Sequence, residues 1–327
     1  MSKDYLYDII GLGECLVDVV VDPPGKDSVH FEGRAGGAPV NVLACASKLG
    51  LKTGFIGMLS NDALGKYLMK TLVDAGVCVR HAAVTSKYPT TLAIVSLDEK
   101  GDRSFSFYRN NTSDVMLDKE DVDFSAIDKS RIFHFGSVSM TAEPSRSATL
   151  AAAAYAKKAG CLVSYDPNLR PSLWSSMEEA YRVIHRGLEY ADLVKVSEEE
   201  LFFLTNAGTL EQGVEKLLGQ YSFKLLALTL GPKGCSVYTK SKHFHSNTYD
   251  VKVVDTTGAG DAFWGAFLYK ILSINKEISS LTDDEIVDII HFSNAAGALT
   301  TTARGAIPAL PSKYDIEYCI KNVPLCS

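Results

Sequence analysis

The chain lacks the features that would place it in a membrane or on nucleic acid. No run of 18 apolar residues occurs among its 327 residues, and its first residues, MSKDY, contain no apolar segment of signal length. Basic residues number 33 against 39 acidic ones, so the formal net charge is −6. Proteins that bind a phosphate backbone normally carry a basic surface. We therefore expect a cytoplasmic protein with neither a nucleic-acid nor a membrane partner.

Patterns of metal-binding or disulfide-forming residues are also missing. The seven cysteines include no C-x-x-C pair, and most of them lie in apolar stretches. This usage is typical of reduced, buried thiols. The seven histidines form neither an H-x-x-x-H nor an H-E-x-x-H pattern. The sequence thus argues against a disulfide framework and against a metal site built on cysteine or histidine.

The two most familiar nucleotide-binding motifs are absent. No G-x-x-x-x-G-K-[ST] loop occurs, and the glycines at Gly11 and Gly13 are not followed by the third glycine of a G-x-G-x-x-G fingerprint. The sequence therefore gives no support for a P-loop nucleoside triphosphatase or for a dinucleotide-dependent dehydrogenase. Any phosphate site in this chain must be built differently.

What is present is a regular alternation of short apolar runs with helical periodicity from about residue 38 onward. This pattern predicts repeated β-α units, hence a three-layer α/β/α sandwich with a mostly parallel, doubly wound sheet. Glycines and prolines delimit the elements. We expect helices at 39–49, 62–75, 145–159, 176–190, 198–204, 210–220 and 283–302, one more after Gly260, and strands at 53–59, 131–136, 162–166, 193–196 and 224–230.

Two regions, 14–35 and 89–110, interrupt the alternation because they contain strand patterns without helices between them. Residues 16–21 form one apolar run, and residues 92–97 and 103–108 flank the turn sequence 99–102. We expect these strands to form a small β-sheet lid over the carboxyl ends of the main strands. The prediction is one domain over residues 1–327, either monomeric or a homodimer formed through the lid.

The segment DTTGAGD at Asp255–Asp261, followed by an apolar helical stretch, has the composition of an anion cradle. Its threonines are candidate N-cap residues, and its glycines allow the backbone to approach a ligand closely. The first N–H groups of the helix would then face negative charge. A carboxylate at Asp261 would suit the removal of a hydroxyl proton in phosphoryl transfer. An ordinary capped helix with a first-turn Asp is the alternative.

A second glycine pair precedes a helix at Gly36 and Gly37, and Asn41 follows within its first turn. Glycine N–H groups, the Asn41 amide and the Asp18 carboxylate would suit the vicinal hydroxyls of a sugar, since each hydroxyl both donates and accepts. A plain helix start, with Pro39 in its first turn, is the alternative here.

These segments, with Gly13-Glu14 near the start, resemble the ribokinase-like (pfkB) carbohydrate kinases over nearly the whole length and in the same order. Within that family the sequence is most similar to the fructokinases. This closer likeness lies in residues 107–110 (FYRN), residues 166–170 (DPNLR) with Trp174, and residues 191–200.

The resemblance implies an ATP-dependent sugar kinase that acts on a ketose, most closely fructose, and uses MgATP with K⁺ as an activator. It implies that the catalytic residues are Asp261 as base and Gly258, Ala259 and Gly260 as anion hole. Sugar binding falls to Asp18, Gly36, Gly37, Asn41, Arg109 and Arg170. The nucleotide would contact Asn168, Lys195, Ser197, Thr229, Gly231, Gly234 and Asn294. Glu200 would act on Mg²⁺ through water, and Asp255 and Thr257 would hold the monovalent cation.

Some of these assignments have alternatives. Ser197 and Glu200 have the spacing of a capping box, and the family usually has Asn-x-x-Glu there. Arg109 would also suit a pairing with an acidic residue. 2-Keto-3-deoxygluconate kinase, ribokinase and a catalytically inactive sugar or nucleotide sensor remain alternative functions. For Asp261, its place at a helix N-terminus predicts a pKa below the reference value of about 3.9.

Overall fold

A computed structural model describes residues 5–21, 28–97 and 103–327, with no side-chain detail for residues 95–105. The predicted hairpin turn at 99–102 lies outside these ranges. Where the chain is described, no helix is long and apolar enough to cross a membrane.

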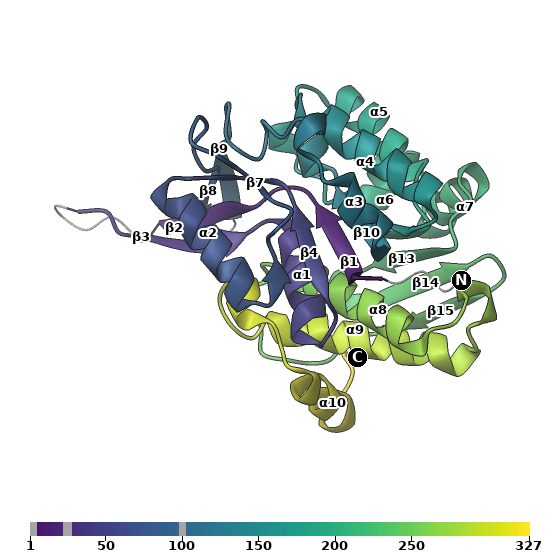
Figure 1. The fold of residues 1–327 in the computed structure, drawn as a ribbon. Coiled ribbons are helices and arrows are strands. Elements are labelled where there is room, and N and C mark those ends of the chain that lie inside the picture. The colour runs from purple at the N-terminus through teal and green to yellow at the C-terminus, as the bar shows by residue number, and fades with distance from the viewer. Residues whose placement is uncertain (1–4, 22–27, 98–102) are drawn as a thin grey trace.

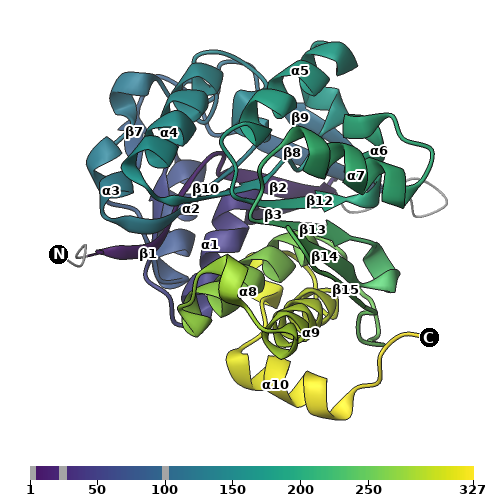
Figure 2. The same ribbon diagram turned by 90° about the vertical axis from the view of Figure 1, so that its right-hand side faces the viewer.

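A nine-stranded sheet forms the centre of the molecule (Figures 1 and 2). Its order is β15-β14-β13-β12-β11-β10-β1-β4-β6, and its pairs are parallel except β13 with β14 and β14 with β15. The parallel strands therefore end at one edge, where a doubly wound fold carries its site. The strands are β1 Tyr7–Leu12, β4 Thr53–Ile56, β6 Val77–Cys78, β10 Ser130–Gly136, β11 Leu162–Asp166, β12 Leu193–Ser197, β13 Leu225–Thr229, β14 Cys235–Thr239 and β15 His243–Ser246.

Helices cover both faces of this sheet and bury two hydrophobic cores. Figure 2 shows the two helical layers above and below the strands. One layer contains α1 Ala38–Lys48, α2 Ala63–Asp74, α8 Ala259–Ile274, α9 Asp283–Thr300 and α10 Lys313–Asn322. The other contains α3 Phe124–Asp128, α4 Ser145–Ala159, α5 Met177–Leu188, α6 Glu198–Thr205 and α7 Leu210–Gln220. The three-layer prediction is confirmed.

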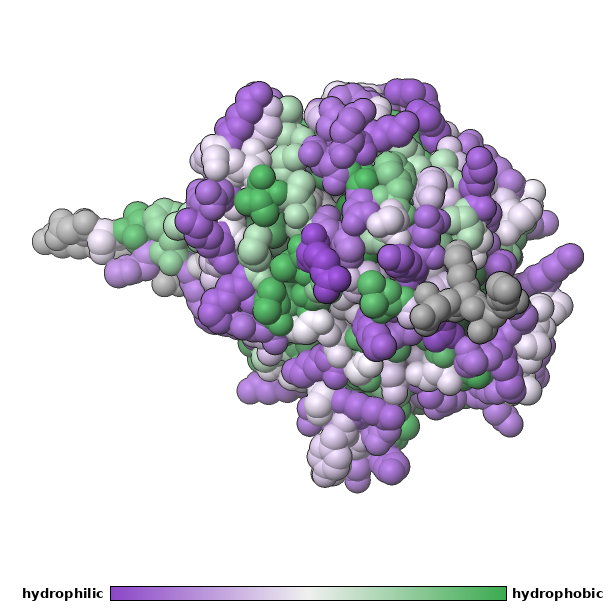
Figure 3. All heavy atoms as spheres, in the orientation of Figure 1, coloured by the Kyte–Doolittle hydropathy of each residue, from purple (hydrophilic) through white to green (hydrophobic). Residues whose placement is uncertain are grey.

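A separate four-stranded sheet, in the order β3-β2-β8-β9, projects from the body at the left of Figure 1. It contains β2 Leu16–Val21, β3 Phe31–Gly36, β8 Leu92–Leu97 and β9 Arg103–Tyr108, as the lid prediction requires. Figure 3 shows hydrophobic surface on this projection. Strands β5 Met58–Ser60 and β7 Ala83–Thr85 form a short parallel pair, and both lie in the sequence between the lid strands β3 and β8.

The helix at 313–322 was not predicted from the sequence. Helix α10 begins with a capping box between Ser312 and Asp315, a signal that the sequence does contain. Its buried side chains, Ile316 and Cys319, add to the core beneath α9. The predicted end of α9 at residue 302 is two residues too late, which is within the usual fraying of helix ends.

Helices α1 and α8 carry Asn41 and Asp261, and they touch at Gly265. A Cβ placed on Gly265 would lie 2.7 Å from both the Cβ of Cys45 and the carbonyl oxygen of Val42. The contact therefore requires glycine, because helix backbone has to move to accommodate any side chain.

We expect Gly265→Ala to lower the free energy of unfolding by about 1–3 kcal/mol, the usual cost of overpacking a core. Gly219 is the matched control, since it also lies in a helix, α7, with open space where a Cβ would point. Gly219→Ala should leave stability unchanged or raise it by up to about 1 kcal/mol through helix propensity. Urea unfolding measures both, and equal stabilities for the two variants would contradict the packing argument.

Candidate active site

A cavity of about 320 Å³ lies at the carboxyl ends of the parallel strands, between the body and the lid. It brings together most of the predicted sugar-binding and catalytic residues. The lining residues are Glu14, Leu16, Asp18, Gly37, Ala38, Asn41, Phe107, Val138, Asn168, Arg170, Lys195, Thr256, Thr257, Gly258, Gly260 and Asp261. Loops after β1, β10 and β11, strand β12, the starts of α1 and α8 and two lid strands all contribute.

Asp261 is buried at the start of α8, with 8% of its surface exposed. Its Oδ2 accepts a hydrogen bond of 2.8 Å from Nδ2 of Asn41. Burial raises the pKa of Asp261 to about 6, although the Asn41 hydrogen bond and the nearby Lys195 and Arg170 lower it. The predicted pKa below 3.9 is therefore wrong: the loss of water outweighs the helix N-terminus.

The N-terminus of α8 is left open toward the cavity. Neither threonine is the N-cap, contrary to the sequence prediction: Gly258 is, in a left-handed conformation, and no side chain caps this end. A Cβ on Gly258 would lie 2.5 Å from the Cβ of Ala306, so both its backbone angle and its surroundings require glycine. The first N–H groups of a helix have no partner within it. Gly258 and Gly260 line the cavity, whereas the N–H of Ala259 donates to the carbonyl of Thr256 at 3.3 Å.

A buried cation stands next to this helix start. The Nζ of Lys195 donates a 2.7 Å hydrogen bond to Oδ2 of Asp166, and both side chains are nearly inaccessible to solvent. Its Nζ is also 3.4 Å from the point where a Cβ of Gly260 would lie. Although burial lowers the pKa of Lys195, the nearby carboxylates, Asp166 foremost, raise it above its ordinary value overall, so the ammonium stays charged. Positive charge and open N–H groups thus converge on one end of the cavity.

Glu200 is a structural clamp in this structure. One of its carboxylate oxygens accepts from the N–H of Leu169 at 2.7 Å and the other from the N–H of Ser197 at 2.8 Å. The N–H of Glu200 in turn donates to the Oγ of Ser197 at 3.2 Å, so the capping-box alternative is confirmed. The clamp holds the loop that places Asn168 and Arg170 on the cavity. No group of three or more acidic, His or Cys residues suited to a metal occurs in the part of the chain described.

The wall with the residues predicted to bind sugar is built around Asp18. A Cβ on Gly36 would lie 2.1 Å from the Asp18 carboxylate, which explains the glycine there. Gly37 itself lines the cavity. Burial raises the pKa of Asp18 to about 6, opposed by the neighbouring Arg170. Glu14, which sequence reasoning did not assign to the site, accepts from the N–H of Ala38 at 2.9 Å. Burial raises the Glu14 pKa to about 7.

Arg109 does not line the cavity. It is buried and donates to Asp114 at 2.7 Å, to Oγ1 of Thr141 at 2.6 Å and to the carbonyl of Val138 at 3.0 Å. The pairing with an acidic residue, given above as the alternative, is what the structure shows. Arg109 ties the end of β9 to the 3₁₀ turn Val138–Met140 of the body.

Asp255 joins two loops below the anion cradle. Its Oδ1 accepts from the N–H of Thr257 at 2.8 Å, and its Oδ2 accepts from the N–H of Gly305 at 3.0 Å. The backbone N–H groups of Val254 and Asp255 both donate to the carbonyl of Thr301. These bonds place the 301–305 segment beside the start of α8.

The remaining predicted nucleotide residues do not line this cavity, and two of them, Gly234 and Asn294, contact residues of a second one. Asn294 of α9 donates from Nδ2 to the carbonyls of Ser246 and Asn247, at 3.1 and 3.2 Å. Gly234 lies against the same two residues, since its Cβ would be 2.0 Å from the Ser246 carbonyl. Thr229 and Gly231 lead into that turn at the end of β13.

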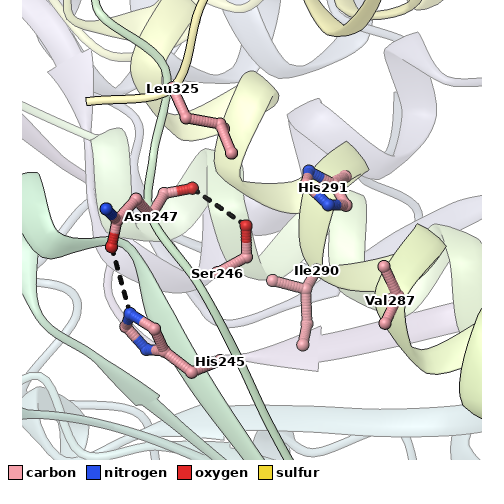
Figure 4. Close-up of a pocket in the computed structure, with 7 residues that line it drawn as sticks. All are labelled: His245, Ser246, Asn247, Val287, Ile290, His291 and Leu325. Atoms are coloured by element: carbon pink, nitrogen blue, oxygen red, sulfur yellow. Dashed lines mark hydrogen bonds between the residues drawn. The ribbon is translucent and has the colours of Figure 1, made fainter. Parts of the chain in front are cut away.

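The second cavity, of about 340 Å³, is lined by His245, Ser246, Asn247, Val287, Ile290, His291 and Leu325 (Figure 4). Two of its lining residues, Ser246 and Asn247, are the residues that contact Gly234 and Asn294. Sequence reasoning did not assign its lining residues, and it likewise missed Leu16, Phe107 and Val138 of the first cavity. Leu16 and Val138 belong to no motif, so only the folded chain identifies them, whereas Phe107 lies in the 107–110 segment that carries the family resemblance.

Comparison with known proteins agrees with this geometry. The pfkB family carbohydrate kinase model matches residues 8–313. The chain is 43% identical to fructokinase-1 of Zea mays over 318 residues, covering 96% of this chain and 98% of that protein. It is 41% identical to probable fructokinase-4 of Arabidopsis thaliana, covering 96% and 97%.

Solved structures show the same fold. A fructokinase from Xylella fastidiosa with bound ATP superposes with a TM-score of 0.89 at 34% identity, covering 97% of this chain and 99% of that one. A Vibrio cholerae O395 fructokinase variant, in a form with fructose, ADP and potassium ion bound, gives 0.87 at 35% identity, covering 97% and 99%. A putative ribokinase II from E. coli, in complex with ATP and Mg²⁺, gives 0.85 at 28%, covering 97% and 99%.

Family model, relatives and structures span nearly the whole chain, and the buried Asp261 beside an open helix N-terminus supplies the matching chemistry. The chain belongs to the pfkB family of carbohydrate kinases.

Proposed function

We propose that this carbohydrate kinase transfers the γ-phosphoryl group of MgATP to a hydroxyl of fructose, giving fructose 6-phosphate. One observation carries the proposal: a buried carboxylate, Asp261, shares a cavity with an uncapped helix N-terminus, the Lys195 ammonium and hydroxyl-binding polar groups. That combination provides a base, an anion site and a polyol site within one water-poor space.

In this function each part of the cavity has a distinct task. Asp18, Gly37 and Asn41 hold sugar hydroxyls and so orient one of them toward Asp261. Asp261 accepts the proton as the hydroxyl attacks phosphorus. The N–H groups at Gly258–Gly260 and the Lys195 ammonium stabilise the charge on the transferring group. Asn168 and Arg170 lie close enough to the same end to contact the phosphates.

A neutral sugar fits this cavity better than an acidic one such as 2-keto-3-deoxygluconate. Of the two arginines that would suit a carboxylate, Arg109 is buried against Asp114 and does not line the cavity. Arg170 remains, but it stands among the carboxylates of Asp18 and Asp261. The names of the relatives in maize, Arabidopsis and Xylella fastidiosa support the same choice.

The test is the release of ADP with a panel of acceptors at fixed MgATP. We expect kcat/KM for fructose to exceed that for ribose, tagatose and 2-keto-3-deoxygluconate. A preference for 2-keto-3-deoxygluconate would overturn the acceptor assignment. Binding of sugar and nucleotide without ADP release would instead support a sensor.

Replacing Asp261 tests the assigned base. We expect Asp261→Asn to reduce kcat by roughly 10²–10⁴-fold, the usual contribution of general base catalysis. Asp284→Asn is the matched control, since Asp284 is an exposed Asp in the first turn of α9. The control should retain wild-type kcat. Near-normal turnover in Asp261→Asn would exclude this residue as the base.

The pH profile supports or refutes the same assignment independently. A raised carboxyl pKa means that the base is protonated, and inactive, below that value. Since the pKa values of Asp261 and Asp18 are both raised to about 6, kcat/KM should fall as the pH drops through about 6, as a coupled titration of the pair. If kcat/KM instead fell only near pH 4, neither carboxyl group would have the raised pKa that its burial predicts.

Mg²⁺ and K⁺ enter this proposal in different ways. Mg²⁺ typically binds through one or two carboxylates plus substrate phosphates, so it is expected to arrive as MgATP, with Glu200 reached only through water. For K⁺, Asp255 and Thr257 are the proposed ligands, and the Asp255 carboxylate holds Thr257 and Gly305 next to each other. The potassium-bound Vibrio cholerae fructokinase supports that site.

Replacing K⁺ by tetramethylammonium at constant ionic strength should therefore lower kcat, because the loops around the anion cradle lose a bound cation. A steady-state assay against a matched KCl series measures the effect. Unchanged activity in tetramethylammonium would remove Asp255 and Thr257 from the set of cation ligands.

The second cavity is the proposed place of the nucleobase. It adjoins Gly234 and Asn294 through Ser246 and Asn247, and a volume of about 340 Å³ is within the range of small-molecule sites. Thr229 and Gly231 would then flank the nucleotide between base and phosphates. Ser197 would approach the same region only through its backbone, since its hydroxyl is engaged in the capping box.

We further propose that residues 1–327 act as one kinase domain, with the lid as an insertion rather than a separate domain. The chain is either a monomer or a homodimer formed through the lid. Strand β3 at the edge of the lid sheet, with Phe31 63% exposed, favours the homodimer. Sedimentation velocity distinguishes the two states.

A further inference from the structure

Residues 323–326 lie beside residues 247–250 and are fixed there by backbone hydrogen bonds. The N–H of Asp250 donates to the carbonyl of Pro324 at 2.9 Å, and the N–H of Cys326 donates to the carbonyl of Thr248 at 2.7 Å. An antiparallel bridge between Tyr249 and Leu325 lies between these two bonds. The segment therefore acts as a short extra strand, and the position of Leu325 is well defined.

This strand supplies part of the apolar wall of the second cavity. Leu325 lines the cavity together with Val287 and Ile290 of α9. Figure 4 shows Leu325 and Ile290 on opposite sides of the cavity. Leu325 is 41% exposed while Ile290 is 1% exposed, so Leu325 keeps surface that a bound group can cover. Covering it would gain free energy through the hydrophobic effect.

The same strand also fixes the polar edge of the cavity. The carbonyl of Cys326 accepts a 2.9 Å hydrogen bond from Nδ2 of Asn247. Oδ1 of Asn247 lies 3.1 Å from Nε2 of His245, as the dashed line in Figure 4 shows. The 323–326 segment thus positions the Asn247 amide, and Asn247 in turn positions the His245 imidazole. One short segment therefore determines both the apolar wall and the polar edge of the cavity.

The chemistry of the lining points to one class of ligand group. The seven lining residues include no Lys or Arg, so the cavity is poorly suited to phosphate. Aliphatic side chains from two sides, with an amide and imidazoles at the edge, suit a flat heteroaromatic ring that has an apolar face and a polar rim. A purine base has these properties.

We propose that Leu325 is a nucleobase-contacting residue, so that the 323–326 strand forms one wall of the nucleotide site of this kinase. This rests on the proposed function, which places the base in the second cavity. Leu325 acts in binding and not in the chemical step, because its side chain lines a different cavity from Asp261.

The test compares the full chain with two substitutions, Leu325→Ala and Leu325→Trp, by calorimetric titration with MgADP. Leu325→Ala removes the contact and should raise the Kd for MgADP roughly 3–10-fold, the loss expected when part of a Leu surface no longer covers the ligand. Leu325→Trp adds bulk to the cavity and should raise it further. Leu6→Ala is the matched control, since Leu6 is 44% exposed just before β1, and it should leave Kd unchanged.

Two further readouts separate base contact from general damage. The Leu325 substitutions should raise the Kd for adenosine by the same factor as the Kd for MgADP. The inhibition constant of inorganic tripolyphosphate and the KM for fructose should stay at wild-type values. Thermal unfolding verifies that both variants fold. Wild-type Kd for MgADP in both variants, or equal weakening of tripolyphosphate, overturns the role of Leu325. Failure of the unsubstituted chain to bind MgADP would instead overturn the proposed function itself.

Discussion

The candidate active site depends on the energetically unfavourable burial of the Asp261 carboxylate at the start of α8. Desolvation makes the ionised form costly, and the structure compensates only in part, with the Asn41 amide, Lys195 and Arg170. The pKa therefore remains raised, near 6. A carboxylate in that state is a stronger base than an exposed one, yet it is still ionised at neutral pH. The close contact of α1 and α8 at Gly265 maintains the Asn41 bond, because these helices carry the two partners.

Charge balance around that carboxylate explains how an acidic chain can hold ATP. The net charge of −6 gives no general attraction for an anion, so positive potential must be local. Lys195, in the middle of β12, and the N-terminus of α8, which no side chain caps, provide it near Gly260. Asp166 holds the ammonium in place, which leaves it preorganised for negative charge that develops during transfer.

Local sequence signals predicted the body of the fold because each element has its own start and stop residues. Helix α4 and strand β11 have the predicted bounds, and Gly160 between them takes the left-handed conformation expected after a helix. Helix α10 was missed although Ser312 and Asp315 mark its start. Family motifs identified Asp18, Gly37, Asn41 and Asp261, which the fold brings to one cavity.

The sequence could not predict properties that depend on surroundings distant in the chain. The pKa of Asp261 was predicted to be low because only the helix end was visible, whereas burial beneath the lid and sheet decides its direction. The threonines before Gly258 look like caps, but Asp255 uses its side chain to tie Thr257 to the 301–305 loop instead. Apolar wall residues such as Val138 and Leu325 belong to no motif.

Arg109 shows how a residue can set the shape of a cavity that it does not line. Its guanidinium joins the end of β9 to Val138 and Thr141 of the body. Phe107, two residues earlier, and Val138 both line the cavity, so a bond between their neighbours fixes the distance between the lid wall and the body wall. Asp114 neutralises the arginine, which allows this link to lie in the interior. The lid is therefore anchored at its base by a buried ion pair, and the shape of the cavity between lid and body depends on that anchor.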